Sequence, residues 1–448
     1  MAAVIAPHQA SAQVREEANV APRIPEGQQP QQIEERRQHL FNLMLANPAD
    51  LDTAFEYASL SSQAGDLEAA ISTLERMLIF APDVPRLQLE LGVLYFRLGS
   101  YEVARNYFNS VLSAPNVPDP VKLRVDRYLA AIKTQTAVNR FDGAVLFGAR
   151  YQSNANGGAI DRIIDLNGRD FILNDAALAD ADTNAFVSGS FHYSHDFSTQ
   201  GDRFDVDLST YGALYAQHDE INIALADVRF GPVFNLDRFR LEDTELGVYG
   251  ILGGIVLQGD PYRLGGGAGI KLSKRFSPQT RAEVRFEYQY QDYRNSTLRP
   301  TADDRTGDKY LVGGVLLHQL TDRVSVFGFL NSERTEARRE YESNRQIEAG
   351  LGMNYSFAAP FTFKNEPGLW TVGLAAGFGR RLYDEPDPDI NARVAQRDVE
   401  SFVRGTLTIP LAETWSMQTT VGYQNVSSNY DIDSFDNIST SIGFMKRF

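Results

Sequence analysis

The sequence predicts two structural classes in succession: an N-terminal tetratricopeptide helical array, followed by a 14-stranded antiparallel outer-membrane β-barrel. Three observations support this prediction. A helical pattern repeats after 34 residues in the first third of the chain, apolar and polar residues then alternate with a period of two, and fourteen segments carry that alternation. We therefore divide the chain into an N-terminal leader over residues 1–30, a helical domain over 31–138 and a barrel over 140–448.

The composition narrows the classes of function. The chain has 448 residues, a formal net charge of −15 and no Cys. The negative charge argues against non-specific binding to nucleic acid or to anionic lipid faces, and the lack of Cys excludes disulfides and zinc–thiolate sites. No segment approaches the roughly 18 consecutive apolar residues of a membrane-spanning helix, so any passage through a membrane must depend on strands.

Residues 1–30 are predicted to comprise the remnant of a signal peptide and a linker. Ala10-Ser11-Ala12 before Gln13 resembles the small-x-small end of a signal peptide, with an ordinary disordered Ala-rich terminus as the alternative. Residues 13–30 are polar and contain three prolines, which is typical of a linker.

The helical domain shows the 34-residue period of tetratricopeptide repeats. Each repeat has a small residue in its first helix, Gly at the turn and Ala in its second helix, and Pro follows. The residues that define the repeats are Ala58, Gly65, Ala70, Pro82, Gly92, Gly99 and Ala104. Small residues let paired helices approach closely, the Gly adopts the backbone conformation of the turn, and the Pro ends the second helix. We expect two full repeats with one further helix on each side, either as a groove that binds protein or as a rigid spacer.

Alternation with a period of two begins near Phe141 and continues to the end of the chain. In RAEVRFEYQYQDYR, every second residue from Ala282 to Tyr290 is apolar or aromatic, and the residues between them carry charged or amide side chains that point to the other face. The fourteen segments are centred near residues 147, 191, 211, 228, 251, 269, 286, 314, 328, 351, 375, 403, 422 and 441. One face carries charges in strand after strand, which favours a membrane barrel over a soluble β-domain.

The connections indicate how the strands cross the membrane. Longer connections follow odd-numbered strands at 155–184, 295–308, 335–345 and 384–397, and short ones such as STQGDR and LTD follow even-numbered strands, with exceptions in both groups. This pattern is typical of outer-membrane barrels with long external loops. An even strand count places both ends of the barrel in the periplasm, and the sheet must close because lipid offers no hydrogen bonds. The terminal aromatic, Phe448, resembles the signal that the barrel insertion machinery recognises.

Ionisable side chains on the polar face are candidates to line the barrel lumen. These residues are Asp205, Asp207, Arg229, Lys271, Glu283, Arg285, Glu287 and Arg404. Charges of both signs occur among them. We interpret them either as satisfied ion pairs that fill the interior or as the lining of a path for a client.

No arrangement of catalytic residues is evident, and we predict no enzymatic activity, metal or cofactor. His192 and His195 lie three apart on a strand, so their side chains point to opposite faces and cannot share a metal. The Gly-rich segment 264–271 lacks the strand–loop–helix context of a phosphate-binding loop. The function must therefore be sought in binding or transport.

The combination of helical repeats and a barrel resembles the surface lipoprotein assembly modulator (Slam) family. The first barrel segment, FDGAVLFGARYQSNAN, ends in Ser153-Asn154-Ala155-Asn156, which is similar to the end of the first strand in that family. The resemblance covers roughly residues 35–448. It implies an outer-membrane translocator whose periplasmic repeats bind a client that the barrel conducts to the cell surface. The implied client is a lipoprotein or a secreted haem-carrying protein.

The sequence also leaves two alternative functions open and leads us to expect particular partners. The alternative function is an exopolysaccharide export porin with a periplasmic tetratricopeptide scaffold, and a plain porin with a scaffold arm is a third possibility. The near-balanced charge of the predicted lumen residues disfavours polymer export. We expect a monomer in outer-membrane lipid, with a periplasmic protein client and the barrel insertion machinery as partners and with no nucleic acid.

Overall fold

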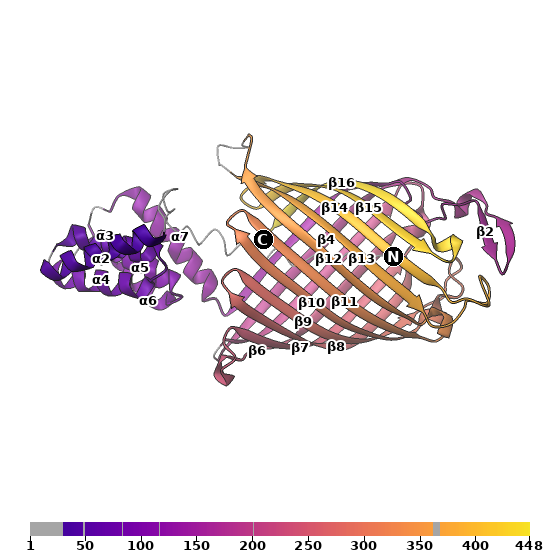
Figure 1. The fold of residues 1–448 in the computed structure, drawn as a ribbon, viewed down its shortest axis with the longest axis horizontal. Helices are drawn as coiled ribbons and strands as arrows, with labels where there is room; N and C mark the ends of the chain where they lie inside the picture. The colour runs from indigo at the N-terminus through magenta and orange to yellow at the C-terminus, as the bar shows by residue number, and fades with distance from the viewer. Residues whose placement is uncertain (1–29, 48–49, 83, 116, 200, 362–367) are drawn as a thin grey trace. The chain divides into compact units, whose positions relative to one another are not determined.

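The computed structural model describes residues 30–47, 50–82, 84–115, 117–199, 201–361 and 368–448 (Figure 1). These residues form a helical unit and a β-unit, which divide between Ala137 and Val138. The predicted signal remnant and all but the last residue of the predicted linker lie outside the described residues.

Six α-helices form the described part of the helical unit. They are α2 (Pro30–Ala46), α3 (Leu51–Gln63), α4 (Leu67–Phe80), α5 (Pro85–Arg97), α6 (Tyr101–Ser113) and α7 (Asp119–Gln135). The pairs α3–α4 and α5–α6 are the two predicted repeats, and α2 and α7 flank them, which confirms the predicted helical array. None of the helices that the structure describes is long and apolar enough to cross a membrane.

Small residues allow the helices of each repeat to pack closely. Gly65 and Gly99 adopt φ values of +86° and +81° after α3 and α5, a left-handed conformation that costs glycine little. At Gly92, an added Cβ atom would lie 2.6 Å from the ring of Phe108 on α6. Pro82 lies in the turn after α4. The alanines of the pattern are almost fully buried: Ala58, Ala70 and Ala104.

Two apolar clusters form the core of the helical unit. The first includes Leu74 and Met77 of α4 with Leu91 of α5. The second includes Phe108 of α6 and Val125 of α7. Each such side chain contributes about 1.5–3 kcal/mol when it is fully buried, so the clusters make the array a packed unit rather than a string of helices.

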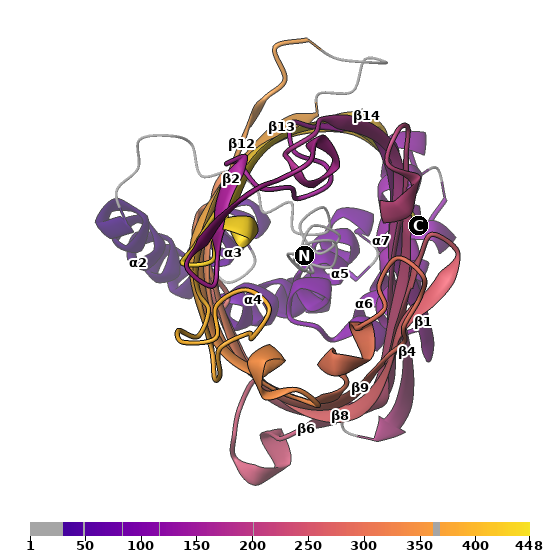
Figure 2. The same cartoon turned by 90° about the vertical axis from the view of Figure 1, so that its right-hand side faces the viewer.

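Fourteen antiparallel strands form a closed barrel in the described residues (Figures 1 and 2). They are β1 (Asn139–Gln152), β4 (Asp182–Thr199), β5 (Asp202–Tyr215), β6 (Ile223–Asn235), β7 (Thr244–Leu257), β8 (Asp260–Ser277), β9 (Thr280–Tyr293), β10 (Gly307–Thr321), β11 (Val324–Ala337), β12 (Asn344–Ala358), β13 (Leu369–Tyr383), β14 (Arg397–Ala412), β15 (Trp415–Ser428) and β16 (Phe435–Arg447). Each strand contains one of the predicted centres. The predicted strand count and fold class are therefore confirmed.

The barrel closes where its first strand meets its last. β1 pairs with β16 over nine residues, ending with Gln152 opposite Ser439. Phe448 donates its backbone amide hydrogen to the carbonyl oxygen of Gly143 at 3.0 Å. Closure gives the backbone groups of both strands partners, as the interior of a bilayer requires. Because the strand count is even, both ends of the barrel lie on the same side of the membrane.

The connection between β1 and β4 contains a hairpin that the sequence analysis did not predict. Its strands, β2 (Ile163–Leu166) and β3 (Arg169–Ile172), pair with each other outside the barrel sheet. Asn167 and Gly168 form the turn, with φ values of 53° and 80°, which is typical of an Asn-Gly hairpin. Short 3-10 helices lie in other connections: η1 (Asp175–Ala177), η2 (Asp219–Ile221), η3 (Asp237–Phe239), η4 (Ala302–Arg305), η5 (Glu340–Glu342) and η6 (Asp431–Asp433).

Candidate functional site: the barrel interior

Alternation along the strands separates a lipid face from an interior face. On β9, Val284, Phe286 and Tyr288 are exposed by 54, 43 and 38%, whereas Glu287 beside them is only 2% exposed. Hydrocarbon favours the apolar outer face, and charged groups are then confined to the interior. Closure brings strands that are distant in the sequence around one interior (Figure 2).

Two of the predicted lumen residues form an ion pair across the inner wall. Arg229 on β6 lies 3.1 Å from Glu287 on β9, and Tyr249 on β7 donates its hydroxyl hydrogen to the same carboxylate at 3.0 Å. β7 and β8 separate β6 from β9 in the sheet, so the pair spans the concave surface. The buried carboxylate is therefore both neutralised and hydrogen-bonded.

A second ionic group contains two residues that the sequence analysis did not select. Arg203 on β5 lies 3.0 Å from the predicted Asp205 and 2.8 Å from Glu245 on β7. Arg203 and Asp205 are two residues apart on one strand, so the alternation could have identified Arg203. Glu245 lies in the apolar, Gly-rich strand TELGVYGILGGIVL, where weak alternation gave no comparable signal.

Two more predicted carboxylates have polar partners. Asp207 lies 2.8 Å from His192 on β4, and Ser273 on β8 donates its hydroxyl hydrogen to Glu283 at 3.3 Å. The sequence analysis considered His192 only as a metal ligand. Its partner depends on the register of β4 with β5, which places the two residues opposite each other.

The predicted residues gather on one part of the wall, with one exception. Lys271 and Arg285 stand opposite each other on β8 and β9. With the five predicted acidic and basic residues described above, they occupy β5 to β9. We call this region the charged sector. Arg404 lies apart on β14 and is exposed.

Another part of the inner wall bears mostly uncharged polar side chains, and we call it the neutral sector. It extends over five adjacent strands, β14, β15, β16, β1 and β4. The intervening residues Val403, Val421 and Ile442 face outward, with 56, 52 and 49% exposure. The inward-facing residues that define the sector are Thr406, Thr408, Gln418, Thr420, Ser439, Ser441, Gln152, Ser188 and Ser190.

The Ser-Asn-Ala-Asn segment after β1 organises the first external connection. Asn154 is 3% exposed. Its side-chain amide donates to the carbonyl oxygen of Gly158 at 2.9 Å and accepts the amide hydrogen of Gly158 at 2.9 Å. The side chain of Asn437 on β16 accepts the backbone amide hydrogen of Asn154 at 3.2 Å. The segment therefore fixes the path of the chain beside the β1–β16 closure.

The β2–β3 hairpin lies at the rim of the barrel (Figure 2) and is held by another external loop. The backbone amide of Asn167 donates to the carbonyl oxygen of Ile390 at 2.8 Å. Its side chain donates to the carbonyl oxygen of Pro388 at 2.9 Å and accepts the amide hydrogen of Ala392 at 2.7 Å. The connections after β1 and β13 are thus joined into one layer at the external end.

Two titratable groups in the external connections have shifted pKa values. Burial lowers the pKa of His218, but the carboxylates of Glu220 at 2.8 Å and Asp180 at 3.2 Å outweigh burial and raise it overall. Burial and the negative charge of Asp398 raise the pKa of Asp433 on η6 to about 6. The ionic state of these loops therefore depends on pH.

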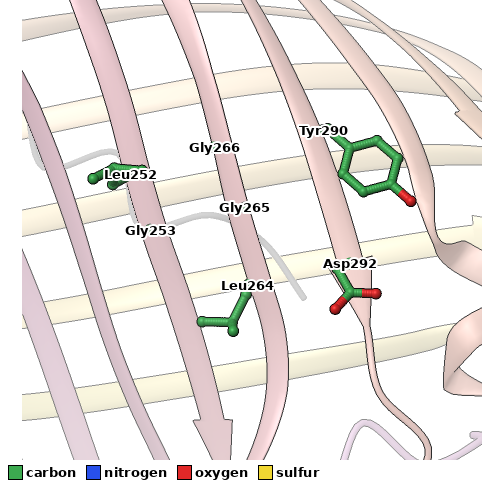
Figure 3. Close-up of a pocket in the computed structure, with 7 residues that line it drawn as sticks. All are labelled: Leu252, Gly253, Leu264, Gly265, Gly266, Tyr290 and Asp292. Carbon is green, nitrogen blue, oxygen red and sulfur yellow. The ribbon is translucent and has the colours of Figure 1, made fainter.

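A pocket of about 550 Å³ lies on the outer wall, over β7, β8 and β9 (Figure 3). Leu252, Leu264 and Tyr290 line it and are 57, 48 and 48% exposed, so it belongs to the lipid face. Gly266 carries no side chain, which leaves the surface hollow between these residues. Asp292 lies at one end (Figure 3), 3.6 Å from Arg294. The pocket lies outside the interior and was not predicted.

The described residues contain no group of three or more His, Cys, Asp or Glu side chains that could hold a metal ion. His192 contacts Asp207, whereas His195 contacts Asn139 at 2.8 Å. The two histidines therefore have separate partners.

The barrel sequence matches a known family of proteins. The profile of the surface lipoprotein assembly modifier family matches residues 190–448, which is more than half of the chain. The chain belongs to this family. This family member is an outer-membrane barrel with a periplasmic helical array, and its family indicates a role in surface lipoprotein assembly rather than catalysis. The resemblance inferred from the sequence is confirmed.

Three solved structures are similar to parts of this family member at low identity. A bacterial polysaccharide outer membrane secretin is 11% identical, with 68% of this chain and 98% of that chain covered and a TM-score of 0.35. A Pseudomonas aeruginosa FadL homologue is 9% identical, with 71% and 92% covered and a TM-score of 0.37. The Yersinia enterocolitica type III secretion chaperone SycD, in complex with a peptide of the translocator YopD, is 17% identical, with 23% and 82% covered and a TM-score of 0.22. These likenesses are too low to carry an argument about function. No curated protein sequence matches the chain.

Proposed function

We propose that this family member moves a protein client, a lipoprotein or a secreted haem-carrying protein, from the periplasm to the cell surface. The helical array binds the client and the barrel interior conducts it. The observation that carries this proposal is the neutral sector, a polar wall over five adjacent strands with partly exposed side chains. Family membership supports a lipoprotein as the class of client.

A wall of hydroxyl and amide groups suits the passage of a polypeptide. Ser, Thr and Gln side chains both donate and accept hydrogen bonds, so they can exchange partners with any passing segment. Asp205 and Glu287 of the charged sector are already held by Arg203 and Arg229, which reduces their tendency to trap cationic side chains. The periplasm offers no nucleotide, so binding and folding free energy drive the transfer.

Exposed apolar side chains on the helical array support a client-binding role. Ile79 and Phe80 at the end of α4 are 78 and 54% exposed, and Leu45 at the end of α2 is 61% exposed. Neighbouring apolar side chains on a domain surface are typical of contact sites for other proteins. In this proposal the array holds the client at these residues, and the chain acts as a monomer that the barrel insertion machinery assembles.

Surface display of candidate clients in a deletion strain tests the proposal. The full chain should restore a lipoprotein client to the cell surface. A variant that lacks residues 31–135 should retain a heat-modifiable barrel that no longer delivers the client. In the full chain, I79S/F80S should deliver less client, whereas L123S, which changes another exposed apolar residue, on α7 with 61% exposure, should deliver normally. Undiminished delivery by the truncated chain contradicts a guiding role for the array.

Polymer output in the same strains separates protein delivery from exopolysaccharide export. Loss of the surface client with unchanged polymer supports the proposal. Loss of exported polymer with an unchanged surface client overturns it in favour of the export porin.

A further inference from the structure

Two arginines project into the neutral sector without carboxylate partners. Arg150 on β1 lies over the ring of Phe186, 4.9 Å from its centroid, and donates to the hydroxyl oxygen of Tyr211 at 3.1 Å. Arg404 on β14 lies over the ring of Phe402, 5.9 Å from its centroid. In the described residues, no ion pair joins either guanidinium group to a carboxylate, unlike Arg203 and Arg229 of the charged sector.

The strand register places hydroxyl groups between the two arginines. β15 and β16 separate β14 from β1 in the sheet. Arg404 stands opposite Gly422 on β15, which has no side chain to shield the guanidinium group. The hydroxyl-bearing residues on the intervening strands are Thr420, Ser439 and Ser441. The positive charges of Arg150 and Arg404 repel each other, so the wall between them favours a negatively charged ligand.

We propose that Arg150 and Arg404, with the hydroxyl groups between them, form an oxyanion-binding site in the barrel interior. A guanidinium group matches the geometry of a carboxylate or phosphate and makes strong charge-assisted hydrogen bonds to it. The oxyanion that binds there is the carboxylate of an Asp or Glu side chain of the client, while the client passes through the barrel interior. This source rests on the proposed function, whereas the binding site itself does not.

Inorganic phosphate is a suitable probe of the site in the purified full-length protein. A ligand that binds only the folded state raises the unfolding temperature as its concentration rises. Phosphate should therefore stabilise the wild-type protein beyond chloride at equal ionic strength. R150Q/R404Q should weaken this phosphate effect by roughly tenfold or more in concentration, because charge-assisted contacts are lost. R281Q, which removes an inward-facing cation from β9 in the charged sector, is the matched control and should keep the effect.

A second variant keeps the site testable if R150Q/R404Q does not fold. R150K/R404K keeps both positive charges but loses the planar fork, so it should fold and bind phosphate more weakly than the wild-type protein does. A wild-type protein that gains no more from phosphate than from chloride overturns the site. Full retention of the phosphate effect in R150Q/R404Q also overturns it.

Delivery assays separate the source of the oxyanion from the proposed function. R150Q/R404Q should slow delivery of an acidic client more than delivery of the same client with Asp and Glu changed to Asn and Gln. Equal delivery of both clients by R150Q/R404Q and by the wild-type chain overturns the client carboxylate as the ligand and leaves the proposed function intact. If the wild-type chain delivers neither client, the proposed function fails, while the phosphate result still decides the site.

Discussion

Inside the barrel, the partners of a charged side chain decide what its burial costs. Glu287 is 2% exposed and binds Arg229 and Tyr249, whereas Arg404 is exposed and forms no ion pair within the described residues. The sequence alternation predicts the face on which such residues lie, because each step along a strand reverses the side-chain direction. It does not predict their partners. Arg229 and Glu287 are 58 residues apart and meet only when the register of four strands is set.

Loss of Arg229 should destabilise the barrel more than loss of the whole ion pair. R229A leaves the carboxylate of Glu287 buried without a cationic ion-pair partner, hydrogen-bonded only to the neutral side chains of Tyr249 and Gln289. We expect a loss of about 3 kcal/mol in the free energy of unfolding, at the lower end for a broken buried pair because Arg229 is partly exposed. Denaturant unfolding in detergent micelles measures this loss. The control R229M/E287M removes both charges and should lose less than R229A, and equal or larger losses in the control contradict the argument.

The pKa of His218 predicts a pH-dependent link between two external connections. The protonated ring can donate to Glu220 and to Asp180, which lies in the connection after β1. Because folding raises the pKa of His218, its stabilising contribution is complete below the ordinary value of about 6.5 and is lost as pH rises through the raised value. Hydrogen exchange of residues 216–222, corrected for its intrinsic pH dependence, should therefore show protection that falls with rising pH. H218Q should remove this dependence, and H39Q on the exposed face of α2 should not.

At the scale of elements, the membrane makes the barrel strands predictable. Each strand must be apolar on one side and long enough to cross, so the alternation extends over ten or more residues and locates all fourteen. The β2–β3 hairpin escaped prediction because its strands have four residues each and lie outside the bilayer. Its one sequence signal was Asn167-Gly168, the dipeptide that fits a tight hairpin turn. Its attachment to the loop after β13 depends on tertiary structure and could not be predicted.

Asn167 should determine whether the hairpin stays docked on the loop after β13. N167A removes two side-chain hydrogen bonds, at about 1 kcal/mol each. It also places Ala, which tolerates the left-handed conformation less well than Asn does, at a φ of 53°, which costs roughly 1 kcal/mol. We expect local opening of residues 163–172 to become easier by about 3 kcal/mol, measured by hydrogen exchange. N167G keeps the turn without strain and should lose only about 2 kcal/mol. If both variants leave the protection of the hairpin unchanged, Asn167 does not hold the hairpin in place.

At the scale of the whole molecule, closure turns a local alternation into two distinct inner surfaces. The charged sector occupies β5 to β9, and the neutral sector occupies β14 to β16 with β1 and β4. The second surface exists only because β1 and β16 pair, which joins hydroxyl-bearing residues from the two ends of the barrel sequence. Sequence analysis predicted closure from the needs of a backbone in lipid. It did not predict the two sectors, because they depend on which strands become neighbours.

Cysteine pairs can test the closure directly, because the chain has no Cys of its own. Ala149 on β1 stands opposite Ile442 on β16. Opposed residues of antiparallel strands have Cα atoms about 4.5–5.5 Å apart, which lies within the range for a disulfide. A149C/I442C should therefore cross-link under mild oxidation, seen as a mobility shift of the denatured, unreduced chain. The control A149C/I438C places the second Cys four residues away, roughly 13 Å along the strand, and should not cross-link.

The cross-linked barrel also distinguishes conduction through the bore from release through an opened β1–β16 seam. A disulfide between residues 149 and 442 prevents these strands from separating but leaves the inward-facing side chains of the neutral sector unchanged, because both positions face lipid. If the client passes through the bore, as we propose, oxidised A149C/I442C should deliver it at nearly the rate of the reduced protein. Delivery that stops on oxidation and returns on reduction, while A149C/I438C is unaffected by either treatment, would show that strand separation is required and would contradict conduction by a barrel that stays closed.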